Sequence, residues 1–273
     1  MGSSMRKPII TLLSDFGLKD PYVAEMKAAI LSICREALII DISHEVEKFN
    51  VRMGAFLLAQ AAPYFPKGTI HIAVVDPSVG ISRRAIIAET KRSLYVGPDN
   101  GLLMLAAEND GIRHIYEISN PKYMLRRVSR TFHGRDIFSP AAAYLATGVA
   151  PYIFGPEIHD PVKPSFSSPR VHDGVIFGEI IHVDGFGNLI TNISEELLES
   201  AGISEGVSLS VQLGEKHLKI GLASSYGDVE VNTPLAIIGG TSFLEISVNR
   251  GNASEILGAR VSFPVRVKKI ADG

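Results

Sequence analysis

Three polar turns in the first half of the chain each follow a short apolar run. They are Ser14–Gly17, Asp76–Gly80 and Gly97–Gly101. Because ligands bind outside the carboxyl ends of strands in parallel α/β sheets, these turns are candidate ligand sites. The carboxylate of Asp15 can accept hydrogen bonds from both hydroxyls of a ribose, and it can equally cap its own turn. The Asp99-Asn100-Gly101 segment is typical of turn chemistry, and we interpret it as structural.

Candidate groups for proton transfer and anion binding lie outside these turns. His133 precedes a predicted helix, and an unperturbed histidine pKa of ~6.5 suits proton transfer; a surface or capping role is the alternative. Asp136 has the residue type of a helix N-cap. Arg83 and Arg84 can bind an anion, although paired arginines more often form surface ion pairs.

The second half of the chain offers two glycine-containing turns, Asp184–Asn188 and Asn249–Ala253. Glycines beside an aromatic residue let the backbone approach a ligand closely. The amide of Asn188 can both donate and accept, which suits the edge of an adenine. The alternative is that both segments are ordinary β-turns.

Composition and absent motifs exclude several classes of protein. The net charge of −2 carries no electrostatic footprint for nucleic acid or an anionic membrane, and the single Cys34 excludes a disulfide framework. No apolar run reaches the ~18 residues of a membrane span. Dinucleotide, P-loop, zinc-protease and nucleophile-elbow motifs are missing, and the histidines lack ligand spacing. We therefore expect a cytoplasmic protein without metal, nucleic-acid or membrane partners.

The alternation of apolar runs in the first half predicts an α/β layer with a mostly parallel sheet. Strands are expected at 9–13, 38–42, 69–75, 85–88, 94–96 and 114–118. Helices are expected at 22–33, 51–62, 102–107 and 136–147. Asp20 and Pro21 have the residue types of the N-cap and first position of the first helix.

Beyond a Pro/Ser-rich linker candidate at Pro161–Pro169, helical periodicity nearly vanishes. Short strands punctuated by Gly, Asn and Ser predict a smaller antiparallel β-barrel. We expect an α/β domain over residues 5–165 and the β-barrel domain over residues 166–273.

Taken together and in order, these segments resemble the S-adenosylmethionine (SAM) hydroxide adenosyltransferase family, the adenosine-forming SAM hydrolases. SAM-dependent fluorinase and chlorinase are its relatives. The resemblance runs from Ile9 to Val265 through Ser14–Gly17, Asp76–Gly80, Arg83-Arg84, Gly97–Gly101, Phe132–Asp136, Asp184–Asn188 and Glu245–Asn249. It implies an N-terminal α/β domain, a C-terminal β-barrel and a homotrimer, with SAM between the N-domain of one subunit and the C-domain of its neighbour.

The resemblance implies a catalytic triad of Asp76, Arg83 and His133, with Arg84 as the alternative arginine. Halogenases of the family lack this triad and use a halide pocket. One departure is Ser78, where the family more often has glycine.

The resemblance also implies substrate contacts. Asp15 accepts the ribose hydroxyls, Asp184 holds the methionine ammonium and Asn188 holds the adenine. The other implied contacts are Phe132 beside the adenosyl group, Thr241 and Ser242 at the methionine carboxylate, and Asn249 and Arg250 near the adenine end.

The implied reaction is attack of water or hydroxide on the ribose C5′ of SAM, giving adenosine and L-methionine. SAM is the substrate, and no cofactor or metal is expected because the sulfonium is already an activated leaving group. A cationic Arg83 would favour hydroxide, and His133 could bind the water or carry its proton away. The alternatives are a SAM-dependent halogenase and a non-catalytic SAM or adenosine sensor.

Overall fold

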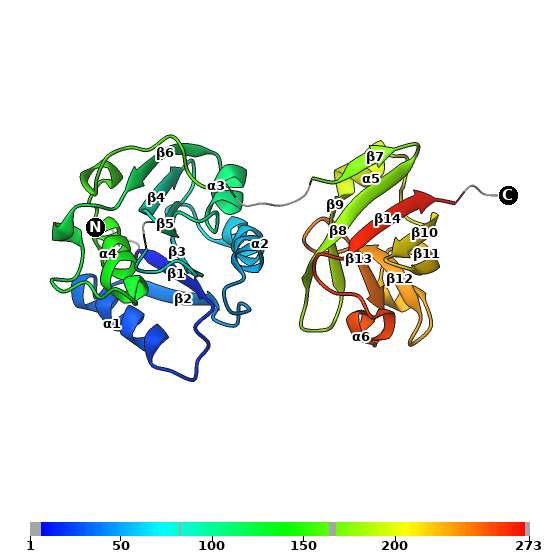
Figure 1. Ribbon diagram of the computed structural model, residues 1–273, viewed down its shortest axis with the longest axis horizontal. Coiled ribbons are helices and arrows are strands. Elements are labelled where there is room, and N and C mark those ends of the chain that lie inside the picture. Colours follow the sequence, from blue (N-terminus) through cyan, green and yellow to red (C-terminus); the bar gives the residue numbers. More distant parts are fainter. Residues whose placement is uncertain (1–6, 82, 164–167, 271–273) are drawn as a thin grey trace, which may run out of the picture. The chain divides into compact units, whose positions relative to one another are not determined.

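The computed structural model describes residues 7–81, 83–163 and 168–270. These residues form two compact units, one before and one after residues 164–167 (Figure 1). The centre of the predicted linker and the predicted boundary at 165/166 lie outside the described residues.

The first unit contains a six-stranded sheet in the order β2-β1-β3-β5-β4-β6. Its strands are β1 (Ile9–Ser14), β2 (Leu38–Ser43), β3 (Ile70–Val74), β4 (Ala85–Thr90), β5 (Leu94–Pro98) and β6 (Ile112–Glu117). The β2-β1-β3-β5 part is parallel, whereas β4 is antiparallel to both β5 and β6. The short connection between β4 and β5 forces their antiparallel pairing, since parallel neighbours need a long crossover. The predicted mostly parallel sheet is confirmed.

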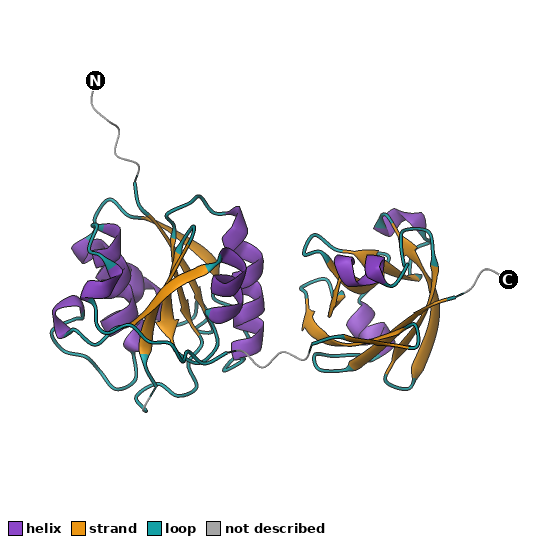
Figure 2. Cartoon of the chain, turned by 90° about the horizontal axis from the view of Figure 1, so that it is seen from above, coloured by secondary structure: helices purple, strands orange, loops and turns teal. Residues whose placement is uncertain are grey.

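Helices cover both faces of this sheet (Figure 2). They are α1 (Tyr22–Ile33), α2 (Val51–Ala61), α3 (Met104–Asp110) and α4 (Ser139–Ala146), with shorter turns η1 (Ala62–Tyr64), η2 (Pro121–Tyr123), η3 (Gly134–Phe138) and η4 (Pro151–Ile153). Leu12 packs in the core that contains α1 and α4, while the next residue, Leu13, packs with α2 and α3. The continuous apolar run of β1 therefore reflects a strand buried on both faces.

Two predicted helix starts are wrong. Pro21 occupies the N-cap position of α1, and no side chain caps that helix. The expected helix at 136–147 begins instead as a π-helical turn, η3, before α4. Asp136 lies inside η3 and is fully buried rather than exposed at an N-cap.

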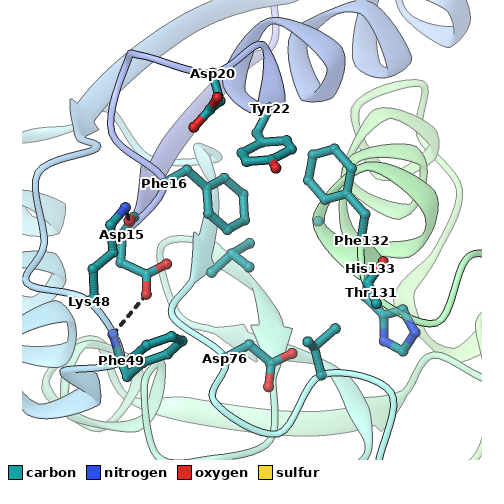
Figure 3. A pocket seen from close by; sticks show the side chains of 13 residues that line it. Asp15, Phe16, Asp20, Tyr22, Lys48, Phe49, Asp76, Thr131, Phe132 and His133 are labelled. Carbon is teal, nitrogen blue, oxygen red and sulfur yellow. Dashed lines mark hydrogen bonds between the residues drawn. The ribbon is translucent and has the colours of Figure 1, made fainter.

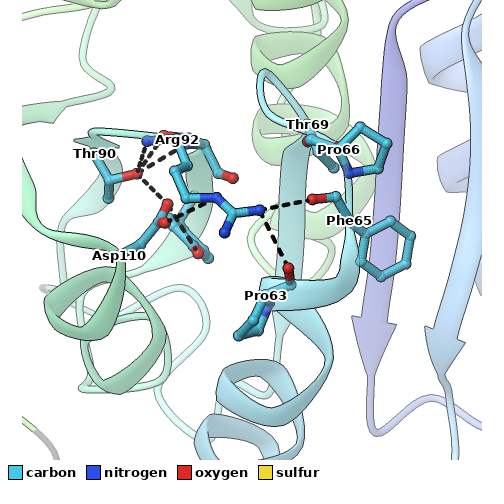
Figure 4. A network of polar contacts seen from close by, with 9 residues as sticks. Pro63, Phe65, Pro66, Thr69, Thr90, Arg92 and Asp110 are labelled. Atoms are coloured by element: carbon cyan, nitrogen blue, oxygen red, sulfur yellow. Dashed lines mark hydrogen bonds and ion pairs between the residues drawn. The ribbon is translucent and has the colours of Figure 1, made fainter.

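A polar network at the β4–β5 turn ties this turn to the connection after α2 (Figure 4). Arg92 donates from Nη2 to the carbonyls of Pro63 and Phe65, each at 3.2 Å. Its Nε lies 3.7 Å from Oδ1 of Asp110, whose other oxygen accepts from Thr90 Oγ1 at 2.5 Å. The arginine thus pairs with carbonyls at the end of η1, where the helical turn leaves them without an intrahelical partner.

The second unit is a closed barrel of seven strands with one further strand on its edge. Its strands are β7 (Arg170–His172), β8 (Val175–Val183), β9 (Leu189–Ser194), β10 (Ser208–Leu213), β11 (Lys216–Ala223), β12 (Pro234–Ile238), β13 (Phe243–Val248) and β14 (Pro264–Lys269). Their order is β14-β10-β11-β12-β13-β9-β8-β7, and pairing of β14 with β8 closes the ring. All pairs are antiparallel except β11–β12, which is parallel. The predicted β-barrel is confirmed.

Short helical segments join the barrel strands: α5 (Glu195–Ser200), α6 (Ala253–Leu257) and the turn η5 (Tyr226–Asp228). The barrel core is filled by inward side chains from its strands, such as Ile176 of β8, Leu209 of β10 and Val265 of β14. Among the described residues of either unit, no helix combines the length and apolar character needed to cross a membrane.

Candidate active site

A buried ion pair joins the end of β3 to the start of β4. Arg83 donates to Oδ2 of Asp76 from Nε at 2.9 Å and from Nη2 at 2.5 Å. The side chains of Arg83 and Asp76 are only 8% and 5% exposed, so dissolved salt screens the attraction between their charges only weakly. The other carboxylate oxygen of Asp76 accepts from the hydroxyl of Ser78 at 3.3 Å. Ser78, the departure from the family pattern, thus adds a hydrogen bond to the turn.

His133 completes this cluster. Nη2 of Arg83 lies 2.7 Å from its Nδ1. A guanidinium can only donate, so Nδ1 carries the lone pair and the neutral ring carries its proton on Nε2. Burial lowers the pKa of His133 and the Arg83 cation lowers it further, against opposing effects of Asp76, Asp136 and the Ser129 backbone. The ring is therefore a neutral hydrogen-bond donor at neutral pH.

The turn η3 fixes the position of His133, which immediately precedes it. Asp136 inside η3 accepts from the backbone N–H of Ser129 and from Nε of Arg135, both at 2.7 Å. Burial alone raises the pKa of Asp136, but these hydrogen bonds outweigh it and leave the pKa below its usual value. The carboxylate is thus ionised and holds the segment that carries His133.

Close packing brings the loop of Arg83 against the loop of His133. Gly80 has φ +77°, and a Cβ there would lie 2.2 Å from the carbonyl oxygen of Arg130. Only glycine permits this approach without moving the backbone. The guanidinium of Arg83 also lies 5.2 Å from the ring centroid of Phe138, within cation–π range.

Arg84, the alternative arginine, points into a different environment. It donates from Nε to Oδ2 of Asp99 at 2.8 Å and from Nη1 to Oδ1 of Asp160 at 2.7 Å. Asp99 also accepts from the backbone N–H of Val162 at 2.8 Å. The geometry therefore gives the contact with Asp76 and His133 to Arg83, and it gives Asp99 the structural role expected of it.

Asp15, Asp76, Phe132 and His133 line one cleft at the carboxyl ends of β1 and β3 (Figure 3). Other parts of its wall come from Phe16, Asp20, Tyr22, Lys48, Phe49, Val74, Val79, Thr131 and Gly134. Phe132 packs edge-on against Phe16 and Tyr22, with ring centroids 5.7 and 5.3 Å away. The cleft thus combines an apolar aromatic wall with three carboxylates and a neutral imidazole.

The carboxylate of Asp15 is buried and fixed by its neighbours. Its Oδ2 accepts from the backbone N–H of Phe49 at 2.9 Å, and Nζ of Lys48 bonds its main-chain oxygen. This hydrogen bond uses one of the two carboxylate oxygens of Asp15. Phe49, the donor, has a left-handed backbone with φ +65°. Asp15 therefore joins two loops rather than simply capping its own turn.

Polar contacts of Ser14 and His44 support the Asp15 loop. The hydroxyl of Ser14 lies 2.7 Å from Nδ1 of His44, and Nε2 of His44 lies 3.2 Å from Oδ1 of Asp41. Ser14 Oγ also accepts from the backbone N–H of Phe16 at 3.3 Å. The hydrogen bond between Ser14 and His44 thus ties the end of β1 to the residue that follows β2.

The barrel unit has a pocket of its own. Asp184, Asn188 and Arg250 line it, together with Phe186, Tyr226, Glu245, Val248, Gly251 and Asn252. Oδ1 of Asp184 accepts from the backbone N–H groups of Phe186 and Asn188, each at 2.9 Å, and Oδ2 accepts from Nδ2 of Asn188 at 2.9 Å. The segment is a β-turn closed by its own aspartate. One N–H of the Asn188 amide is engaged in this way, so its second N–H and its side-chain oxygen are left to meet a ligand.

Family models match both units. Residues 10–155 match the SAM hydroxide adenosyltransferase N-terminal domain, and residues 178–266 match the C-terminal domain. The chain belongs to the SAM hydroxide adenosyltransferase family.

Curated relatives of this adenosyltransferase-family chain span nearly its full length. A Methanocaldococcus jannaschii protein named (R)-S-adenosyl-L-methionine hydrolase is 40% identical, over 94% of this chain and 95% of its own. A Thermus thermophilus protein of the same name is 37% identical, over 94% and 98%. A fluorinase of Actinopolyspora mzabensis is 27% identical, over 98% and 100%. Among solved structures, an uncharacterized conserved protein from Thermotoga maritima superposes with a TM-score of 0.91 at 39% identity, over 95% and 99%.

Three residues predicted from the family resemblance, Thr241, Ser242 and Asn249, are not among those that line the pocket of the barrel unit. Ser242 sits in the β12–β13 turn, where its carbonyl accepts from the N–H of Glu195 at 3.0 Å. Asn249 donates from Nδ2 to the carbonyl of Val229 at 2.8 Å. Their predicted substrate contacts, like that of Thr241, stay predictions.

Sequence reasoning gave no site role to Lys48, Phe49, Tyr226 and Glu245, which line the two pockets of this family member. Phe49 gave no signal, because its left-handed backbone is a property of the fold. Glu245 did give one, since an acid inside the apolar run of β13 must be buried. It is 5% exposed, and Tyr226 Oη donates to its Oε2 at 3.1 Å.

Proposed function

We propose that this chain hydrolyses S-adenosyl-L-methionine to adenosine and L-methionine. The observation that carries the proposal is the contact of Arg83 with both Asp76 and His133, at the edge of a cleft that also holds Asp15. The names of the hydrolase relatives support the same substrate and reaction.

In the proposed reaction, the oxygen of water or hydroxide forms a bond to C5′ of the ribose. The C5′–S bond breaks, and its electron pair neutralises the sulfonium to give the thioether of methionine. When water attacks, its surplus proton leaves to solvent. Because the leaving group is already activated, the reaction requires no metal or cofactor, and a chelator should leave the rate unchanged.

The cluster assists by charge and by position. The Arg83 cation stabilises a nearby anion, so it favours hydroxide over water. Its hydrogen bond to Nδ1 leaves Nε2–H of His133 to hold the nucleophile as a donor. Asp76 holds the guanidinium by two hydrogen bonds. Holding the nucleophile in line with the C–S bond contributes within the ~7–11 kcal/mol ceiling for positioning.

Substrate recognition is proposed to use groups on both units. Asp15 accepts hydrogen bonds from the ribose hydroxyls, Phe132 lies beside the adenosyl group, and the amide of Asn188 holds the edge of the adenine. Asp184 receives the ammonium of methionine. Further substrate contacts are proposed for Ser242, Asn249 and Arg250. We also propose a homotrimeric assembly, which light scattering would measure. The cytoplasmic location stays a prediction.

The test incubates the purified chain with SAM separated into its two sulfonium epimers, and chromatography then measures adenosine and methionine. Both epimers are needed because the relatives' names specify the (R) form. In 18O-labelled water the adenosine 5′-oxygen should carry the label. If neither epimer yields adenosine, the proposal is overturned. Unlabelled adenosine would exclude attack by solvent.

Halogenation is the second candidate, because fluorinases are among the relatives at 27–28% identity. Adding fluoride or chloride to the same incubation tests it, since a halogenase would release 5′-halo-adenosine. Binding of SAM with neither product would instead indicate a sensor.

A further inference from the structure

The pocket of the barrel unit contains a buried carboxylate that its protein surroundings leave largely unpaired. Glu245 lies in β13, where apolar side chains precede and follow it, and it is 5% exposed. In the described part of the chain, Tyr226 is the one hydrogen-bond partner of this carboxylate. A buried carboxylate with a single neutral donor is costly unless a cation completes it.

The backbone makes room for this carboxylate. A Cβ at Gly239 would lie 1.7 Å from Oε1 of Glu245. Glycine at this position therefore lets the acid lie flat against the β12–β13 turn, inside the pocket that Asp184 and Asn188 also line. Oε1 can occupy this position only because residue 239 has no Cβ.

The electrostatics of the pocket favour a positively charged ligand. Burial raises the pKa of Glu245, the negative charge of Asp184 acts in the same direction, and only Tyr226 opposes them. Burial and the charge of Glu245 in turn raise the pKa of Tyr226 to about 12. A cation placed between Glu245 and Asp184 would offset both the cost of burying Glu245 and the repulsion between the two carboxylates.

We propose that Glu245 is a specificity-determining residue that receives the α-ammonium group of the methionine part of the substrate, together with Asp184. The proposal rests on the proposed function and names a ligand group within it. Asp184 already accepts three hydrogen bonds from its own turn, whereas Glu245 accepts one. An ammonium has three donors and no acceptor, so it needs a second carboxylate of this kind.

The test compares ligands that differ only in the ammonium. Calorimetry measures the binding of L-methionine and of 4-(methylthio)butanoate, which lacks the amine, with and without adenosine present. The full chain should prefer methionine by about tenfold or more, the range of a hydrogen bond to a charged group. Glu245→Gln keeps the shape and should abolish that preference while leaving adenosine binding intact.

Two further variants keep the test sharp. Glu230→Gln removes the same charge from an exposed position in this unit and should keep the preference for methionine. Gly239→Ala displaces the carboxylate without removing it and should behave like Glu245→Gln. A preference for methionine that survives in Glu245→Gln would overturn the proposal. So would failure of the unaltered chain to bind methionine, or loss of adenosine binding in Glu245→Gln with methionine binding unchanged.

Turnover separates this inference from the proposed function. If the unaltered chain releases adenosine from SAM and Glu245→Gln keeps the same KM, Glu245 has no part in binding while the hydrolase function stands. If the unaltered chain releases no adenosine, the hydrolase function fails and the methionine-binding comparison still decides the role of Glu245.

Discussion

Nη2 of Arg83 donates to Nδ1 of His133 across 2.7 Å, and this one hydrogen bond sets the chemistry available to the imidazole. It fixes the tautomer with the proton on Nε2. It also disfavours protonation of the ring, because a charged imidazole would lie next to the Arg83 cation. The role of His133 that fits this geometry is to hold the nucleophile by donation. Proton removal through Nδ1 would require the bond to Arg83 to break.

The first prediction concerns pH. Because burial and Arg83 lower the pKa of His133, the ring should stay neutral down to a pH below its unperturbed value of ~6.5. kcat/KM should therefore stay constant near neutral pH. It should fall at acid pH, because protonated His133 and Arg83 carry like charges and repel each other. A pH–rate profile measures this limb. His133→Asn keeps an acceptor for Arg83 but cannot titrate, so its weaker activity should lack the limb; an unchanged limb would assign it to another group.

The second prediction separates the two adjacent arginines. Arg83→Lys replaces a planar fork that contacts both Asp76 and His133 with a single ammonium. We expect kcat/KM to fall on the order of 10²-fold, the scale for losing a preorganised electrostatic group. Arg84→Lys changes an ion pair with Asp99 and Asp160 and should alter kcat/KM by only a few fold. Thermal melting of both variants checks that each is folded, and equal losses of activity would contradict the assignment.

The third prediction concerns recognition of the ribose by Asp15. Asp15→Asn keeps the shape but loses the charged acceptor, so KM for the substrate should rise on the order of tenfold to 100-fold. The 2′-deoxy analogue of the substrate already lacks one of the donors. Steady-state kinetics should therefore show a smaller effect of the variant on this analogue. An equal effect on both substrates would point to a role of Asp15 in joining loops alone.

The fourth prediction concerns stability rather than catalysis. His71 in β3 is fully buried, accepts or donates at Nδ1 with Thr11 at 2.8 Å, and stacks on Tyr95. Burial lowers its pKa to about 4, with the charge of Asp110 acting in the opposite direction. As the pH falls below ~6.5, the unfolded chain takes up the proton first, so the free energy of unfolding decreases until about pH 4.

The size of that effect is testable by denaturant unfolding at several pH values. The shift of the pKa corresponds to at most about 3 kcal/mol of stability lost between pH 7 and pH 4. His71→Gln cannot titrate in this range and should lose less stability over the same interval. Parallel pH dependence in the two proteins would contradict the prediction.

Much of this protein follows from its sequence alone. Continuous apolar runs such as 9–13 indicate strands buried on both faces, and the loss of helical periodicity after residue 161 indicates the barrel. The ordered motifs predicted the family, and the resemblance implied the triad of Asp76, Arg83 and His133, with Arg84 as the alternative arginine. These features are local in the chain, or depend only on the order of residue types, so the sequence carries them directly.

The tertiary structure decided what depends on contacts between distant segments. Arg83 and Arg84 are neighbours of the same type, and only the folded loop directs the first toward His133, 50 positions away. The contact of Tyr226 with Glu245 beside Gly239 likewise depends on the pairing of β12 with β13. Periodicity reports which face of an element is buried, whereas these partners are chosen by how the chain closes on itself.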